Sequence, residues 1–247
     1  MNNCAILGYK NDKIIGWNST NLNLNLNLNL KVQKIVSSSY TFTREIIGYE
    51  ILLDFSSPPG VAVSYLYFIN GQVLDYTLNY LYKMDSSVFK GKTIFINVDR
   101  TNLCNKITLK KIALLSSHLI KINKITLVVE ITERNLCGKC IQIADGLAFL
   151  KNENVKLAID DYDIYKGDFR THELIDDIYE YIKIDAPQTE LDCKTLNDFI
   201  THRNEKIIIE RIENNYQLRE INTTLIYGLQ GYLFDYGRNI SSLNSNH

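Results

Sequence analysis

The sequence lacks a hydrophobic run long enough to cross a lipid bilayer. Of its 247 residues 45% are apolar, yet no continuous apolar stretch approaches the roughly 18 residues that a membrane-spanning helix needs. The N-terminus, Met1-Asn2-Asn3-Cys4, also lacks the charged and apolar regions of an export signal. We therefore expect a cytoplasmic protein without a membrane partner.

Basic residues are not in excess either. The chain has 27 Lys and Arg residues against 28 Asp and Glu residues, and its formal net charge is -1. Proteins that bind extended nucleic acid need a basic patch, so we expect neither DNA nor RNA as a partner. Charged residues make up 22% of the chain, which is typical of a globular protein.

Cysteine and histidine are too few and too scattered to indicate a soft-metal or disulfide framework. The 5 cysteines are an odd number in a long chain, which argues against a secreted disulfide scaffold. Cys137 and Cys140 have the spacing of a redox or zinc pair, but no second pair accompanies them, and we interpret them as reduced thiols. The 4 histidines lack ligand spacing and favour surface or packing roles.

Short apolar runs alternate with helical patterns along most of the chain, and each run carries a polar side chain at or near its end. These side chains are Glu50, Asn97, Glu130, Asp160 with Asp161, Lys183, Glu210 and Gln230. The intervening ranges 66–89, 108–120, 138–152, 189–203 and 214–224 read as helices. Strands separated by helices imply a parallel sheet, and a typical barrel of this kind has about 250 residues. We predict an α/β fold, a TIM-type (β/α)8 barrel with the polar side chains at one rim.

The predicted barrel occupies residues 31–238. Before it lies a segment, 1–30, that ends in five consecutive Asn-Leu pairs from Asn21 to Leu30, and after it a polar C-terminal tail, 239–247. Alternation would place the leucines on one side of a strand, whereas asparagine favours turns and caps. We favour a peripheral strand or partly ordered segment over an interaction motif for this low-complexity repeat.

The rim residues have the chemistry of a divalent-metal site. Mg2+ and Mn2+ prefer carboxylate and carbonyl oxygens, which Glu50, Asn97, Glu130 and Asp160 supply. Adjacent Asp160 and Asp161 can both turn inward where a strand gives way to a loop, and a shared carboxylate could bridge two ions. Each residue alone is more often structural, but a solvated rim has no reason to repeat acids at the same end of successive strands.

At these positions the sequence resembles the EAL-domain phosphodiesterases of bacteria, which hydrolyse cyclic di-GMP. The similarity runs from about residue 33 to residue 234. Its motifs are Gly48-Tyr49-Glu50-Ile51-Leu52-Leu53, Phe95-Ile96-Asn97-Val98, Glu130-Ile131-Thr132-Glu133, Asp160-Asp161-Tyr162, Ile182-Lys183-Ile184-Asp185, Ile209-Glu210-Arg211-Ile212-Glu213 and Gln230-Gly231-Tyr232-Leu233-Phe234. No single motif is decisive, but their number and order are.

The resemblance implies a modified (β/α)8 barrel that holds two Mg2+ or Mn2+ ions and cleaves one phosphodiester of cyclic di-GMP to give linear pGpG. It implies a first ion held by Glu50, Asn97, Glu130 and Asp160, and a second held by Asp160, Asp161 and Glu210. Lys183 would position the attacking water, so that Lys183, Glu210 and Glu50 form the catalytic set. Gln33, Leu52 and Gln230 would contact substrate, and Glu133 would anchor the loop after the two aspartates. A homodimer is also implied.

Two departures from the family pattern bear on activity. Asp54 stands where the family commonly has an arginine that reaches a substrate phosphate. The loop at 162–168 replaces two family glycines with Asp163 and Tyr165, of which the tyrosine tolerates positive φ poorly. We therefore expect this loop to take another path and to alter regulation or dimerisation before it abolishes chemistry.

These observations favour a metal-dependent cyclic di-GMP phosphodiesterase that lowers the second messenger of the biofilm and motility switch. The alternative is a catalytically inactive regulator that binds the nucleotide or a partner protein, which the altered loop and Asp54 support. A third reading, a barrel hydrolase of another phosphodiester, conflicts with the Gln230-Gly231 match without being excluded by it.

Overall fold

The computed structural model describes residues 28–39, 44–54, 71–134 and 140–246, with side chains to residue 243. The predicted segment 1–30 lies almost wholly outside this part of the chain, as does Cys137. The strands are β1 Leu30–Ser37, β2 Ile46–Leu53, β3 Thr93–Asp99, β4 Thr126–Thr132, β5 Lys156–Ile159, β6 Tyr181–Asp185, β7 Lys206–Glu210, β8 Gly228–Leu229 and β9 Arg238–Asn239. The α-helices are α2 Gln72–Lys83, α3 Lys106–Asn123, α4 Ile141–Asn152, α5 Thr171–Ile175 and α6 Glu190–Thr201.

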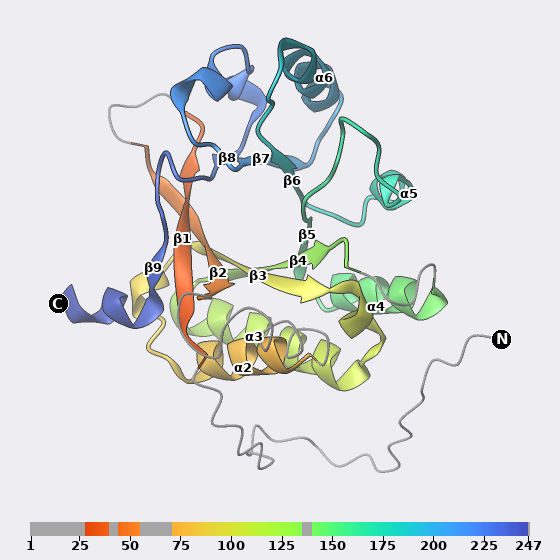
Figure 1. The fold of residues 1–247 in the computed structure, drawn as a ribbon. Helices are drawn as coiled ribbons and strands as arrows, with labels where there is room; N and C mark the ends of the chain where they lie inside the picture. Colours follow the sequence, from red (N-terminus) through yellow and green to blue (C-terminus); the bar gives the residue numbers. More distant parts are fainter. Residues whose placement is uncertain (1–27, 40–43, 55–70, 135–139, 247) are drawn as a thin grey trace.

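The strands close into an eight-stranded barrel, which confirms the predicted fold class (Figure 1). Neighbours from β2 to β8 are parallel, and β1 closes the ring by pairing antiparallel with both β2 and β8. This antiparallel strand is what modifies the ordinary all-parallel arrangement. β9 pairs antiparallel with Lys31 and Val32 near the N-terminus of β1. The predicted polar tail, 239–247, therefore begins inside a strand and continues as the 3-10 helix η5, Ile240–Asn246.

Helices cover the outside of the barrel, and α2, α3 and α4 lie along one side of it in Figure 1. α3 begins where the Asn105 side chain accepts hydrogen bonds from the Ile107 and Thr108 amides, and α6 begins at a capping box of Thr189 and Asp192. The apolar residues Ile143, Leu147 and Leu150 of α4 are buried. Among the described residues, no helix combines the length and apolarity needed to cross a membrane.

The predicted helix at 214–224 is wrong. This stretch contains two short 3-10 helices, η3 Asn215–Leu218 and η4 Thr223–Leu225. Asn214 caps η3 by accepting hydrogen bonds from Tyr216 and Gln217, and such side chains compete with a continuing helix. The other 3-10 helices are η1 Ser87–Phe89 and η2 Arg100–Cys104. Within the range 66–89, which we predicted as one helix, the described residues contain α2 and then η1.

Side-chain alternation along the strands builds the barrel interior in layers. A buried apolar cluster fills one layer and consists of Ile35, Phe95, Val128, Ala158, Tyr181 and Ile208. Because successive strand residues point to opposite faces, the residue two positions further along points inward again. That next layer contains Asn97, Glu130, Asp160, Lys183 and Glu210. The polar side chains therefore lie on an apolar floor at the C-terminal end of the parallel strands.

Candidate metal centre

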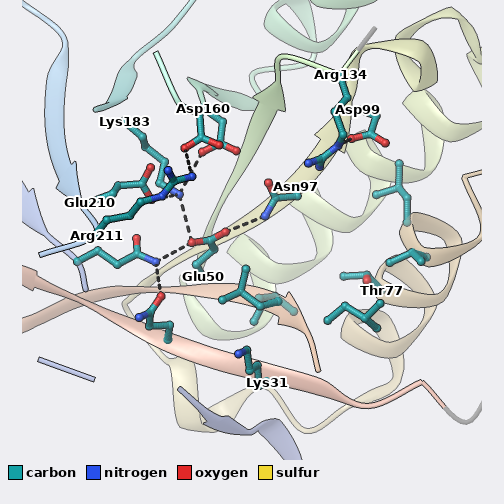
Figure 2. Close-up of a pocket in the computed structure, with 18 of the residues that line it drawn as sticks. Lys31, Glu50, Thr77, Asn97, Asp99, Arg134, Asp160, Lys183, Glu210 and Arg211 are labelled. Atoms are coloured by element: carbon teal, nitrogen blue, oxygen red, sulfur yellow. Dashed lines mark hydrogen bonds and ion pairs between the residues drawn. The ribbon is translucent and has the colours of Figure 1, made fainter. Parts of the chain in front are cut away.

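Strand register aligns the polar side chains in the upper layer. Asn97 on β3 pairs with Glu130 on β4, and Gln33 on β1 pairs with Glu50 on β2. Glu50, Asp160, Lys183 and Glu210 line one cavity of about 870 Å³ together with Asn97. Figure 2 shows these side chains converging from different strands toward a common centre. The predicted convergence of distant oxygen donors is thus present in the structure.

Lys183 occupies the middle of the carboxylates, and its side chain is only 1% exposed. Its Nζ lies 2.6 Å from Glu130, 2.7 Å from Glu210, 3.2 Å from Glu50 and 3.4 Å from Asp160. Burial alone would lower the pKa of Lys183, but the surrounding carboxylates raise it well above 10.5. The ammonium therefore stays charged.

One ammonium cannot neutralise this many acids. Burial first, and then neighbouring carboxylates, raises the pKa of Glu130 and Glu210 well above 4.5 even though Lys183 opposes the shift. Burial would also raise the pKa of Glu50, but Lys183 and hydrogen bonds from Gln230 and Asn97 bring it below 4.5. The centre thus holds an excess of negative charge that further cations would stabilise.

Glu130 tests whether a divalent cation fits. Its side chain is 0% exposed, and neither carboxylate oxygen accepts a hydrogen bond, although Lys183 lies within ion-pair distance. An unpartnered buried oxygen is costly, and a hard cation satisfies such oxygens directly. The donors that surround it are carboxylates and an amide, which is the ligand set of Mg2+ or Mn2+. The described residues therefore fit a divalent cation.

Asp160, Asp161 and Glu210 form a second oxygen group. One ligand atom from each of the three lies within 4.8 Å of the others. Asp161 adopts φ 46°, which turns the chain out of the extended conformation of β5 and allows adjacent aspartates to face one site. Burial raises the pKa of Asp160 and Asp161, as it does for Glu210. Asp160 and Glu210 belong both to this group and to the ring of acids around Lys183.

Side-chain amides of Asn97 and Gln230 hold the Glu50 carboxylate by hydrogen bonds. Asn97 Nδ2 donates to Glu50 Oε1 over 2.7 Å, and Gln230 Nε2 donates to Glu50 Oε2 over 2.6 Å. Gln230 also donates to Gln33 Oε1, and Gln33 in turn donates to the Asp235 carbonyl. Gln33, Leu52 and Gln230, the predicted substrate contacts, all line the cavity.

Gly231 makes the position of Gln230 possible. It has φ 149°, and an added Cβ would lie 2.2 Å from the Ile212 carbonyl oxygen. Only glycine permits the chain to pass Ile212 this closely.

Asp54 and the predicted loop anchor Glu133 are not cavity-lining residues in the described part of the chain. Asp54 is half-buried at the end of β2 and is not among the described residues that line the cavity. Glu133 is exposed, and its predicted role as a loop anchor stays a prediction. The loop after the aspartates has positive φ at Asp161 and Gly167, not at Asp163 or Tyr165. It therefore takes a path that accommodates the tyrosine.

Arg170, which sequence reasoning missed, fastens this loop. Its side chain is 0% exposed, donates to the carbonyls of Ile131 and Asp161, and pairs with Asp168 at 2.6 Å. Tyr165 adds a hydrogen bond from its hydroxyl to the Asp185 carbonyl. The only sequence signal for this arrangement was the unusual loop itself.

Two further arginines lie in the cavity wall. Arg134 pairs with Asp99 at 2.7 Å, and Arg211 pairs with both Asp161 and Asp185. Arg211 follows Glu210 directly, and a basic residue next to a candidate metal ligand was the sequence signal that could have identified it.

No model of a known protein family matches the sequence, and no curated protein matches it either. Solved structures do match. The phosphodiesterase PaMucR in complex with c-di-GMP is 19% identical, with a TM-score of 0.69 over 87% of this chain and 99% of that one. An EAL domain protein from Listeria monocytogenes is 17% identical, with a TM-score of 0.63 over 89% of this chain and 92% of that one.

Another match is BlrP1 of Klebsiella pneumoniae, solved with calcium and c-di-GMP. It is 17% identical, with a TM-score of 0.67, and the match covers 86% of this chain and 56% of that one. BlrP1 has also been solved with manganese and the same nucleotide. The chain therefore has the EAL-domain fold, in agreement with the resemblance seen in its motifs.

Proposed function

We propose that this protein hydrolyses cyclic di-GMP to linear pGpG in a reaction that depends on divalent cations. The observation that carries the proposal is the ring of buried acids around Lys183 at the floor of the cavity. The structurally similar PaMucR and BlrP1 are described as complexes with c-di-GMP, which supports the choice of substrate. The cavity volume also lies within the usual range of about 300–1,000 Å³ for small-molecule sites.

Two cations, Mg2+ or Mn2+, would be held by the two oxygen groups. Glu50, Asn97, Glu130 and Asp160 would hold the first, and Asp160, Asp161 and Glu210 the second. When bound, such ions supply Lewis-acid stabilisation of the charge that develops on a phosphate. The unsatisfied oxygens of Glu130 and the shared position of Asp160 support this assignment.

The residues of the chain itself would orient the attacking water. Lys183 stays protonated and can donate a hydrogen bond to the water oxygen, while Glu210, 2.7 Å from the ammonium, can accept its proton. Glu50 is locked by Asn97 and Gln230 and so keeps its orientation as substrate arrives. Attack at phosphorus with loss of the 3′ oxygen leaves one 5′ phosphate and one 3′ hydroxyl, which are the ends of pGpG.

Such a reaction would lower the messenger that controls the switch between biofilm and motile growth. A homodimer is part of the same proposal.

A second candidate function is a catalytically inactive regulator that binds cyclic di-GMP or a partner protein. Its support is the ion pair between Arg211 and Asp161, which engages one oxygen of a carboxylate that the second cation would use. The loop contacts of Arg170 add to this support, because they replace the glycine-rich path of the family.

The discriminating experiment incubates the purified full chain with cyclic di-GMP and Mn2+ or Mg2+ and measures pGpG by chromatography. We expect product from the wild type and none from Glu50→Ala. Glu153→Ala, which removes an exposed carboxylate at the end of α4, is the matched control and should keep full activity. Nucleotide binding without product would favour the regulator. If neither binding nor product is seen, hydrolysis is rejected and a regulator that acts by binding a partner protein is favoured.

A further inference from the structure

Arg211 is placed at the candidate metal centre by an unusual backbone conformation. It has φ 53°, a left-handed conformation that non-glycine residues rarely adopt. The residue follows Glu210, and its side chain runs toward the same centre as Asp160 and Lys183 (Figure 2). The chain thus accepts local strain at a position that directs a guanidinium toward the acids.

The guanidinium forks between two carboxylates. One terminal nitrogen lies 3.0 Å from Asp161 Oδ1 and the other lies 2.8 Å from Asp185 Oδ2. Asp161 belongs to the second oxygen group, with Asp160 and Glu210. Arg211 therefore already satisfies part of the carboxylate that a second divalent cation would need.

This ion pair is exchangeable, unlike the one at Lys183. The side chain of Arg211 is 64% exposed, and those of Asp161 and Asp185 are 36% and 41% exposed. Exposed pairs of this kind are weak, because water competes for both partners. A cation at Asp161 can consequently displace the guanidinium into solvent without leaving a buried charge unpaired.

We propose that Arg211 is a positioning residue, an internal cation that holds Asp161 in place and competes with the second divalent cation for it. The inference rests on the proposed function, because it concerns the same centre. It makes the two cation sites unequal: Lys183 contacts acids of both groups, whereas Arg211 contacts an acid of the second group alone. The second ion then binds only at a higher free cation concentration.

The test measures Mn2+ binding to the full chain, without nucleotide, by calorimetry and by electron paramagnetic resonance of free Mn2+. Arg211→Gln removes the charge and keeps a non-glycine residue at the strained position. We expect the weaker class of Mn2+ sites to tighten by about threefold to tenfold, the effect of losing weak exposed pairs. Arg211→Lys, which keeps the charge but loses the fork, should fall between this variant and the wild type.

Arg134→Gln is the matched control, since Arg134 also lines the cavity but pairs with Asp99, which belongs to neither oxygen group. If Arg134→Gln tightens Mn2+ binding as much as Arg211→Gln does, the gain comes from removing any positive charge near the cavity, and the proposal is overturned. Unchanged or weaker binding in Arg211→Gln would also overturn it, as would the absence of Mn2+ binding in every variant. If Arg211→Gln folds poorly, Arg211→Gly takes its place, because glycine relieves the backbone strain at this position. The same tightening of the weaker Mn2+ sites is expected for it.

Failure of this inference is distinguishable from failure of the proposed function. If Arg211→Gln tightens Mn2+ binding but no variant produces pGpG, the competition is supported and hydrolysis is rejected. If the wild type produces pGpG and Arg211→Gln leaves cation binding unchanged, hydrolysis stands and the competition is rejected.

Discussion

Replacement of Lys183 by methionine should destabilise the cation-free protein strongly. Methionine keeps the volume and apolar stem but removes the ammonium from the centre of Glu50, Glu130, Asp160 and Glu210. Removing one partner of a buried ion pair costs about 3–5 kcal/mol, because the remaining charge is left without compensation. For a chain of this size each kcal/mol corresponds to roughly 2–4 °C in melting temperature. The expected fall is therefore roughly 6–20 °C at pH 7.5 in the presence of a chelator.

The pH dependence gives this prediction its sign. The pKa of Glu130 and Glu210 in the folded protein is already well above 4.5, so the folded state binds more protons than the unfolded state. The stability from these groups is present below about pH 4.5 and is lost as pH rises through the folded pKa. Lys183→Met should raise the pKa of Glu130 and Glu210 further. The difference in free energy of unfolding between the variant and the wild type should therefore shrink in mild acid. Mn2+ should restore more stability to the variant than to the wild type if its acids still bind the ion.

The assay is thermal and urea unfolding followed by circular dichroism, with and without Mn2+, from pH 5 to pH 8. Lys156→Met is the matched control, because Lys156 also lies on a barrel strand and pairs with Glu180 at 2.7 Å but is half exposed. That pair should contribute no more than about 1 kcal/mol. The reasoning is refuted if Lys183→Met is as stable as wild type at pH 7.5, or if the control loses as much.

Three further predictions concern the surroundings of the centre. Glu173→Gln should lower the free energy of unfolding by about 3–5 kcal/mol, because it leaves the buried Arg100 without its charged partner. Burial raises the pKa of Glu173, but hydrogen bonds from Arg100 outweigh this and lower it, so the variant should lose less stability than the wild type as the pH falls, which acid titration monitored by fluorescence checks. Arg170→Ala should free the loop that follows the paired aspartates, seen as faster amide exchange there and as weaker Mn2+ binding, whereas unchanged exchange would contradict the role of Arg170. Gly231→Ala should cost more than about 2 kcal/mol in urea unfolding, because its Cβ would overlap the Ile212 carbonyl, and a neutral result would exclude the close approach.

The barrel and most of the centre were predictable because they depend on strand periodicity. An apolar run that ends in an acid or amide, repeated along the chain, places these groups at one end of a parallel sheet. Asn97 and Glu130 show this well, since the two lie side by side in the register of β3 and β4. No knowledge of loops or helices was needed for this step.

The contacts made by loops were not predictable in the same way. Arg170 and Arg211 act through directions that depend on local dihedral angles, and positive φ at Asp161 and Arg211 is not encoded by hydrophobic pattern. The helix expected at 214–224 failed for a related reason, because side chains such as Asn214 bond to nearby amides and end each turn. The period of apolar residues along the sequence predicts which strands pair, whereas local hydrogen bonds such as those of Asn214 determine the conformation of the connecting loops.

The apolar floor formed by Phe95, Val128, Tyr181 and their neighbours has a kinetic consequence. Because this apolar layer closes one end of the described barrel, solutes enter and leave through the cavity mouth. A nucleotide bound across the mouth would block the exit of cations bound deeper in the cavity, so the cations should exchange no faster than the nucleotide dissociates. Slow departure of product would register as slow exchange of the ions, and both rates should change together in any variant that loosens the lining of the mouth.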